Sequence, residues 1–220
     1  MSSLYRQVCV VTGASRGIGR AIAEDLTAAG ALVAACAVQD APLIGDWRAR
    51  CDVSDEEQVS NFFAETETRL GPPDVLILNA GVLERCALDE MSARQWDRVL
   101  DVNLKGAFLC ARAAWPSMRG RRKGRVIALG SISGTLGTPL ASAYNASKWG
   151  LTGFIKSLAE EGRDHGIFCA LVQPGSTDTD MLRQTPFPPQ MVPQDVAKVV
   201  RFLAAEAPFA MTGSAVEVFG

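Results

Sequence analysis

The feature that most constrains the fold of this chain is a regular alternation of short apolar runs with longer segments of helical periodicity. The apolar runs are continuous, which is typical of strands buried on both faces of a parallel sheet. Strand-like runs fall at 8–13, 31–38, 48–55, 74–81, 124–131, 168–175 and 214–220, and helical segments at 19–30, 54–71, about 92–118, 142–162 and about 194–205. This order predicts an α/β fold, a single doubly wound domain over residues 1–220 with a mostly parallel sheet and helices on both faces.

Two local patterns refine this prediction. The segment "QDAPLIGDWRA" (39–49), between the second and third strands, is short and contains Pro42 and Gly45. A parallel crossover usually needs a dozen or more residues, so we expect its helix to be vestigial or absent. Ser54 and Glu57 have the spacing of a capping box at the start of the next helix.

Composition excludes several functions. The formal net charge of −2 argues against a nucleic-acid partner, and the basic cluster at 119–125 is interpreted as a solvated loop. No apolar run reaches the roughly 18 residues of a membrane helix, and the start has no signal-peptide pattern. Six scattered cysteines and one histidine argue against a metal site and favour a reducing cytoplasm.

A glycine-rich turn follows the first strand and opens the first helix. In "TGASRGIG" (12–19), glycines stand at 13, 17 and 19. Such glycines allow a sharp turn and close approach of a ligand, while the helix N-terminus offers free N–H groups to a pyrophosphate. The alternative is a glycine-rich turn without a ligand.

The chain has one histidine, His165, so proton transfer at neutral pH calls for another group. Tyr144 and Lys148 stand at i and i+4, on one face of a helix. A nearby ammonium lowers a tyrosine pKa, which makes the phenol useful for acid–base catalysis. The alternative is a surface contact on an amphipathic helix.

Two further polar residues stand where ligands or bridges are expected. Ser131 ends a strand, at the carboxyl edge where open α/β folds bind ligands. Asn103 lies within a helical segment, where asparagine is mildly unfavourable, so it is interpreted as a polar bridge.

Taken in order, these motifs resemble the short-chain dehydrogenase/reductase family. They are T-G-x-x-x-G-I-G, N-A-G at 79–81, Asn103, Ser131, Y-x-x-x-K at 144–148 and P-G at 174–175. The resemblance spans the chain from Val8 to the last strand and implies a Rossmann fold. Two departures are Leu78, where the family often has asparagine, and the ending "EVFG" in place of a D-G-G turn.

The resemblance implies a role for each matching residue. Tyr144 is the expected catalytic acid/base, Ser131 binds the substrate oxygen, Lys148 lowers the tyrosine pKa and holds the nicotinamide ribose, and Asn103 fixes a water. The implied cofactor contacts are Gly13, Ser15, Arg16, Gly17, Ile18 and Gly19 in the turn, Asp52 and Val53 at the adenine, Asn79 and Gly81 at the adenosine ribose, and Tyr144, Lys148, Pro174, Gly175, Thr177 and Thr179 toward the nicotinamide.

The expected cofactor is NADP(H) rather than NAD(H). An acid at the end of the second strand would select NAD, but the positions there are Ala37 and Val38. Arg16 in the glycine turn is suited to a charge-assisted bond with a 2′-phosphate.

The predicted reaction is reversible hydride transfer between the nicotinamide and a ketone or secondary alcohol. The nearest resemblance is to 3-oxoacyl-carrier-protein reductases and related carbonyl reductases. Alternatives are a catalytically idle dinucleotide-binding or regulatory protein, an NAD-dependent alcohol dehydrogenase, and a Rossmann-like methyltransferase. The Tyr–Lys pair with Ser131 and Asn103 favours the enzyme.

The substrate segment and the oligomeric state are also predicted. The proline-rich segment 180–194 stands where the family places its substrate loop, with Met181, Phe187 and Met191 as apolar contacts. Its alternative is a plain surface connection. A homo-oligomer, most simply a tetramer, is expected because two long helices carry exposed aromatic residues, namely Trp96, Phe108, Trp115, Trp149 and Phe154.

Overall fold

The computed structural model describes residues 4–39 and 42–220, and its strands form one parallel sheet. In the described part of the chain this sheet has seven strands in the order β3-β2-β1-β4-β5-β6-β7, and every pair is parallel. The strands are β1 (Val8–Thr12), β2 (Leu32–Ala37), β3 (Trp47–Arg50), β4 (Val75–Leu78), β5 (Gly124–Leu129), β6 (Ile167–Pro174) and β7 (Ala215–Val218). The predicted doubly wound sheet is confirmed.

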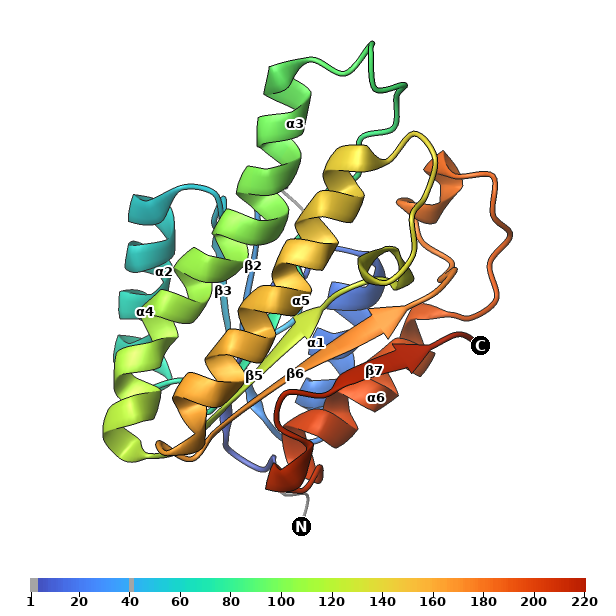
Figure 1. The fold of residues 1–220 in the computed structure, drawn as a ribbon. Coiled ribbons are helices and arrows are strands. Elements are labelled where there is room, and N and C mark those ends of the chain that lie inside the picture. Colours follow the sequence, from blue (N-terminus) through green and yellow to red (C-terminus); the bar gives the residue numbers. More distant parts are fainter. Residues whose placement is uncertain (1–3, 40–41) are drawn as a thin grey trace.

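Helices cover both faces of the sheet (Figure 1). One face carries α1 and α6, and the other carries α2, α4 and α5, while α3 extends past the carboxyl edge of the strands. The helices are α1 (Gly17–Ala28), α2 (Glu56–Arg69), α3 (Ala93–Leu100), α4 (Gly106–Arg121), α5 (Ser142–Arg163) and α6 (Pro193–Ala205).

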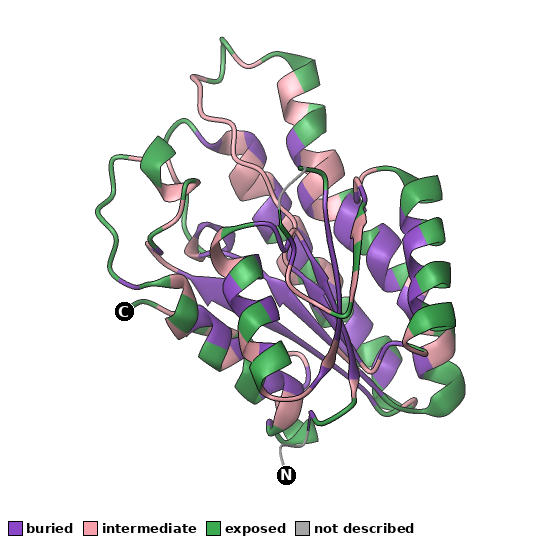
Figure 2. Ribbon diagram, turned by 180° about the vertical axis from the view of Figure 1, so that it is seen from behind, coloured by how far each residue is buried: buried purple, intermediate pink, exposed green. Residues whose placement is uncertain are grey.

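The core consists of two apolar layers, one on each side of the sheet. Successive residues of a strand point to opposite faces, so Val11 packs into the layer beneath α1 and α6 while Val10 packs into the layer beneath α2, α4 and α5. Figure 2 shows the central strands as the most continuously buried part of the chain, whereas the edge strands β3 and β7 are partly exposed. The buried sheet therefore fixes the positions of the segments that follow the carboxyl ends of its strands.

The connection between β2 and β3 has no helix in its described residues, as predicted; residues 40–41 lie outside the described part. The third strand is shorter than predicted and stops at Arg50. The predicted capping box at Ser54 is wrong. Asp55 is the N-cap of α2 and accepts hydrogen bonds from the backbone of Glu57 and Gln58, whereas the Ser54 hydroxyl donates to Asp52.

The long helical segment predicted for about 92–118 is interrupted. Ser92 caps α3 in a capping box with Gln95, and a π-helical stretch, η1 (Asp101–Lys105), joins α3 to α4. A π-helical stretch widens the helix by one residue per turn and often marks a functional site. Asn103 lies in its middle.

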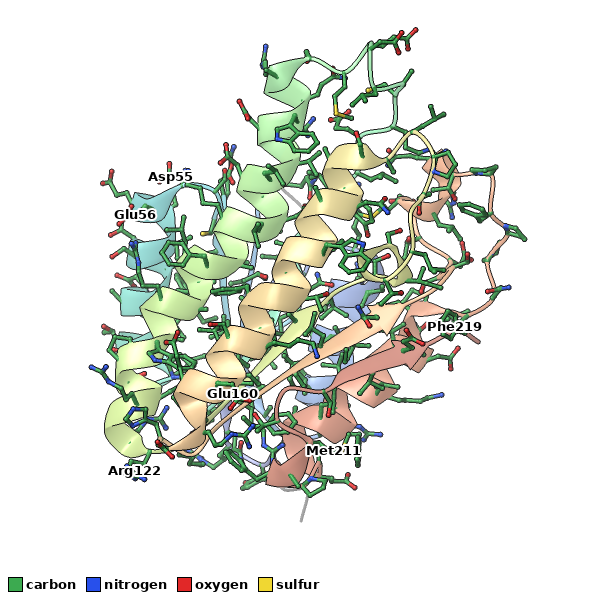
Figure 3. The ribbon with its side chains drawn as sticks, in the orientation of Figure 1. Asp55, Glu56, Arg122, Glu160, Met211 and Phe219 are labelled. Atoms are coloured by element: carbon green, nitrogen blue, oxygen red, sulfur yellow. The ribbon has the colours of Figure 1, made fainter. Side chains whose placement is uncertain are left out.

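The basic cluster is solvent-exposed from Arg119 to Lys123, as interpreted, but little of it is loop, because α4 extends to Arg121 and β5 begins at Gly124. Arg121 and Lys123 both contact the carboxylate of Asp74. Arg125 lies in β5, donates to the carbonyls of Leu203 and Ala207, and stacks on Phe168. Figure 3 places Arg122 at the end of α4, the opposite end of the molecule from the carboxyl edge of the sheet.

Candidate active site

A cavity of about 450 Å³ opens at the carboxyl edge of the sheet. Its wall is formed by the segments that follow β4, β5 and β6 and by the start of α5. The lining residues are Ile18, Leu83, Arg85, Gly130, Ser131, Ile132, Ser133, Leu136, Gly137, Thr138, Pro139, Ala141, Tyr144, Pro174, Gly175, Ser176, Thr177, Thr179, Met181, Leu182, Thr185, Phe187 and Gln190. This wall is mostly apolar, with a few converging hydroxyl groups, as in many ligand sites.

Ser131 and Tyr144 meet in this cavity from two different elements. Ser131 caps a short 3-10 helix, η2 (Ile132–Gly134), and its Oγ accepts a hydrogen bond from the backbone N–H of Ser133 at 3.1 Å. Tyr144 lies in the first turn of α5 and forms a side-chain hydrogen bond with Ser131. Burial raises the pKa of Tyr144, and the bond with Ser131 opposes this increase. The phenol therefore keeps its proton at neutral pH.

Lys148 lies one turn after Tyr144 and is buried, with 4% of its surface exposed. Its Nζ donates to the carbonyl of Leu129 at 2.7 Å and lies 5.6 Å from the centroid of the Tyr144 ring. Burial lowers the pKa of Lys148 to about 8. The Tyr144 pKa is therefore raised overall, not lowered as expected, because desolvation is the largest influence on it. The ammonium of Lys148 donates to the carbonyl of Leu129 instead of to the phenol.

Asn103 acts as a polar bridge, as its sequence position suggests. Its Nδ2 donates to the carbonyl of Val82 and to Ser147 Oγ, each at 3.0 Å, and its Oδ1 accepts from the backbone N–H of Val82 at 2.8 Å. Ser147 in turn donates to the backbone carbonyl of Tyr144 at 2.7 Å. The chain of bonds connects η1, the segment after β4 and the start of α5.

Ser147 was missed by the sequence analysis. The only available signal was its position three residues after Tyr144, which places it on the neighbouring turn of the same helix. Gly81 completes the cluster: a Cβ there would lie 3.4 Å from Asn103 Oδ1 and 3.8 Å from Lys148 Nζ.

The glycine turn leaves the N-terminus of α1 open. Arg16, the N-cap residue, makes no side-chain cap hydrogen bond, and the first turn of α1 holds no acid. By contrast, Asp55 caps α2. Because the first N–H groups of a helix have no partner within the helix, the open end of α1 fits the pyrophosphate of a dinucleotide.

The turn is also tightly packed, both within itself and against the residues that follow β4. A Cβ at Gly13 would lie 2.7 Å from Ala80 Cα, and one at Gly19 would lie 2.3 Å from the carbonyl oxygen of Gly13. Asn79 donates to the carbonyls of Thr12 and Gly13 at 2.9 and 3.0 Å. Asn79 therefore stabilises the turn through these two hydrogen bonds, in addition to its predicted contact with the cofactor.

The residues predicted to contact the adenosine lie around this turn. Arg16 is exposed and 3.7 Å from Asp180, and Ser15 donates to Gln39 at 3.1 Å. The side chain of Asp52 accepts from Ser54. The Val53 side chain is buried against Gly106, and the contact of Val53 with the adenine stays a prediction.

The segments after β6 reach the same cavity. Pro174, Gly175, Thr177 and Thr179 line it, as does Ile18 from the first turn of α1. Of the three apolar contacts predicted in 180–194, Met181 and Phe187 line the cavity. Met191 does not: it is buried in the core and its backbone bridges Thr177.

Metal ligands and membrane spans were considered in the sequence, and the described residues contain neither arrangement. No group of three His, Cys, Asp or Glu side chains is arranged for a metal ion within 4–39 and 42–220. None of the helices in that part of the chain is both long and apolar enough to cross a membrane.

Comparison with known proteins defines the class. A family model described as short chain dehydrogenase matches residues 7–187. The chain is 35% identical to the 3-oxoacyl-[acyl-carrier-protein] reductase FabG of Escherichia coli, over 97% of this chain and 96% of that protein. It is 36% identical to an acetoacetyl-CoA reductase of Shinella zoogloeoides, over 97% of each chain.

The fold agrees with this assignment. The ligand-free structure of aldohexose dehydrogenase from Thermoplasma acidophilum superposes with a TM-score of 0.93 at 30% identity, covering 99% of this chain and 94% of that one. The chain belongs to the short-chain dehydrogenase family and is thereby an oxidoreductase of the carbonyl/alcohol class.

Proposed function

We propose that this protein is an NADP(H)-dependent reductase that interconverts a ketone and a secondary alcohol, with Tyr144 as acid/base. The observation that supports this most is the convergence of the Ser131 and Tyr144 hydroxyl groups at one end of the cavity. Two donors can bind one carbonyl oxygen and stabilise the charge that develops on it. Residues 1–220 act as one cofactor-binding and catalytic unit in this proposal.

Ser131, Tyr144, Lys148 and Asn103 each have a distinct part, and that of Ser131 is a hydrogen bond to the substrate oxygen. A dinucleotide held at its pyrophosphate by the glycine turn, with Pro174, Gly175, Thr177 and Thr179 toward its nicotinamide, would supply the hydride that reduces the carbonyl carbon. The π electrons of the carbonyl pass to its oxygen, which takes the proton from the Tyr144 hydroxyl. Lys148 stabilises the phenolate that remains, and Asn103 holds the start of α5 through Ser147. A proton from solvent restores Tyr144.

The test of this assignment is Tyr144→Phe, which removes the hydroxyl and keeps the ring. Turnover with NADPH and a panel of ketones should fall by about a hundred- to ten-thousandfold, the range contributed by positioned proton transfer. Cofactor affinity, measured by fluorescence titration, should stay unchanged. Turnover near that of the wild type would remove Tyr144 from the mechanism.

The preference for NADP(H) rests on Arg16 and on the absence of an acid at Ala37 and Val38. The ion pair between Arg16 and Asp180 is exposed, so it contributes little and leaves the guanidinium available. Arg16→Ala should raise the KM for NADPH well beyond that for NADH. Arg20→Ala, which removes another exposed arginine of α1 paired with Glu24, is the matched control. Equal effects of Arg16→Ala on both cofactors would contradict the assignment.

The proposed substrates are 3-oxoacyl thioesters and related ketones, by similarity to the named reductases. The mostly apolar cavity wall is suited to an acyl chain.

All six cysteines are free thiols, which supports a reducing, cytoplasmic environment. The aromatic outer faces of α4 and α5 support a homo-oligomer.

A further inference from the structure

The segment from Val82 to Cys86 is anchored at every second residue. Val82 exchanges two backbone hydrogen bonds with the Asn103 amide, and the carboxylate of Glu84 binds Arg98 of α3 at 2.7 Å. The backbone N–H of Cys86 donates to the carbonyl of Leu140 at 3.0 Å. The segment is therefore held from three sides.

The residues between these anchors face the cavity. Leu83 and Arg85 both line it. Arg85 stands between the side-chain ion pair of Glu84 and the backbone hydrogen bond of Cys86, and these contacts hold the segment with Arg85 at the cavity wall. Its half-buried state agrees with that position.

Arg85 is also electrically isolated. Among the described residues that line the cavity it is the only charged one, and the acid that precedes it in the sequence, Glu84, is bound to Arg98. Over 4–39 and 42–220, Arg85 has neither an ion pair nor a side-chain hydrogen bond. A half-buried guanidinium beside apolar groups is costly unless an anion completes its hydrogen bonds.

From this geometry we infer that Arg85 is a specificity-determining residue that binds an anionic group on the substrate, a carboxylate or a phosphate, at a distance from the carbonyl held by Ser131 and Tyr144. The guanidinium fork matches the paired oxygen atoms of either anion. The inference rests on the proposed function and adds a substrate class to it: ketones that carry a negative charge.

Paired substrates separate this class from neutral ketones. In the first set, acetoacetate and levulinate are each compared with the corresponding methyl ester, which keeps the ketone and removes the negative charge. The second is acetoacetyl-CoA with acetoacetyl-N-acetylcysteamine, which lacks the phosphates. We expect kcat/KM to favour the charged member in one set, and the set in which it does so identifies the anion as carboxylate or phosphate.

Three variants assign that preference to Arg85. Arg85→Gln should lower kcat/KM for the charged member about tenfold to a hundredfold, mainly through KM, as expected for loss of a hydrogen bond to a charged group. The neutral member should be unaffected, and Arg85→Lys should restore part of the preference. Arg119→Gln, an exposed arginine at the far end of α4, is the control for the loss of one positive charge.

Failure of this inference can be told apart from failure of the proposed function. If neutral ketones are reduced but charged and neutral partners react alike, or if Arg85→Gln slows both equally, Arg85 does not select an anion. If no ketone is reduced, the proposed function fails, and calorimetric titration of the wild type with levulinate and with acetoacetyl-CoA still decides the question. Binding that weakens about tenfold in Arg85→Gln, and not in Arg119→Gln, supports the inference; unchanged binding overturns it.

Discussion

At the scale of single residues, Tyr144 and Lys148 share a buried environment that disfavours charge on both. Burial raises the tyrosine pKa and lowers the lysine pKa to about 8. A neutral tyrosine beside a lysine that is still protonated at pH 7 is the state required to donate a proton. Once the proton leaves, the ammonium of Lys148 is the charge placed to stabilise the phenolate.

The buried lysine should also affect stability, and the sign follows from proton linkage. Between about pH 8 and its ordinary pKa of 10.5, the folded lysine has lost a proton that the unfolded chain still binds, so the free energy of unfolding increases with pH. Relative to Lys148→Met, the wild type should gain on the order of 3 kcal/mol across this range, since one pKa unit equals about 1.4 kcal/mol. The measurement is urea unfolding of both proteins at pH 7, 8.5 and 10.

The comparison with Lys148→Met cancels the titration of Tyr144 to first order, because both proteins contain it. A difference in unfolding free energy that is the same at pH 7 and pH 10 would show that burial does not lower this pKa.

At the scale of secondary-structure elements, the N-termini of α1 and α2, both near the carboxyl edge, differ in how their free N–H groups are satisfied. Asp55 satisfies the first N–H groups of α2, and Glu56 and Glu57 follow in its first turn. The first turn of α1 has neither a side-chain cap nor an acid. The positive end of the α1 dipole is therefore available to an anion, while that of α2 is neutralised.

The packing of the glycine turn gives a sharp prediction at this scale. Gly19→Ala places a methyl group 2.3 Å from both the Gly13 carbonyl and the Asn79 amide, so the turn must shift. We expect a loss of about 1–3 kcal/mol in unfolding free energy, together with much weaker cofactor binding. Thermal unfolding and fluorescence titration measure the two effects.

A matched glycine-to-alanine substitution in α4 should raise the free energy of unfolding instead of lowering it. A Cβ at Gly120 meets no atom within 4 Å, so Gly120→Ala should stabilise the protein by about 0.5–1 kcal/mol and leave cofactor binding unchanged. If Gly19→Ala were equally well tolerated, the turn would be looser than its contacts indicate.

At the scale of the whole molecule, the outer faces of α4 and α5 lie side by side (Figure 1) and carry aromatic side chains. Phe108 and Trp149 are 42% and 55% exposed, and Phe108 packs edge-on against Phe154 with ring centroids 6.4 Å apart. Exposed apolar surface of this kind commonly marks an interface.

We therefore expect a homo-oligomer, most simply a tetramer, at micromolar concentration. Multi-angle light scattering measures its mass. The double variant Phe108→Glu, Trp149→Glu should shift the mass to a smaller species because it places charge in the interface, whereas Phe209→Glu, on an exposed 3-10 turn elsewhere, should not. A wild-type monomer would contradict the prediction.

Most of the architecture was predictable because it follows from neighbours along the chain. Continuous apolar runs of β-branched residues indicate buried parallel strands, and Tyr144 and Lys148 share a helix face by spacing alone. The glycines of the turn and Ser131 at a strand end likewise indicate the carboxyl edge. These inferences need only the periods of a strand and a helix.

Only the tertiary structure decided the properties that depend on atoms far apart in the sequence. The raised pKa of Tyr144 and the lowered pKa of Lys148 arise from desolvation by elements that pack around α5, with Leu129 holding the ammonium. The burial of Met191 has the same origin. Nothing in the sequence distinguishes Arg85 from the other arginines. Its position at the wall of a cavity with no other charged residue depends on the bonds that hold its segment to α3 and to Leu140. Burial and long-range contacts set the local dielectric and the available partners, and neither is encoded in the spacing of neighbouring residues.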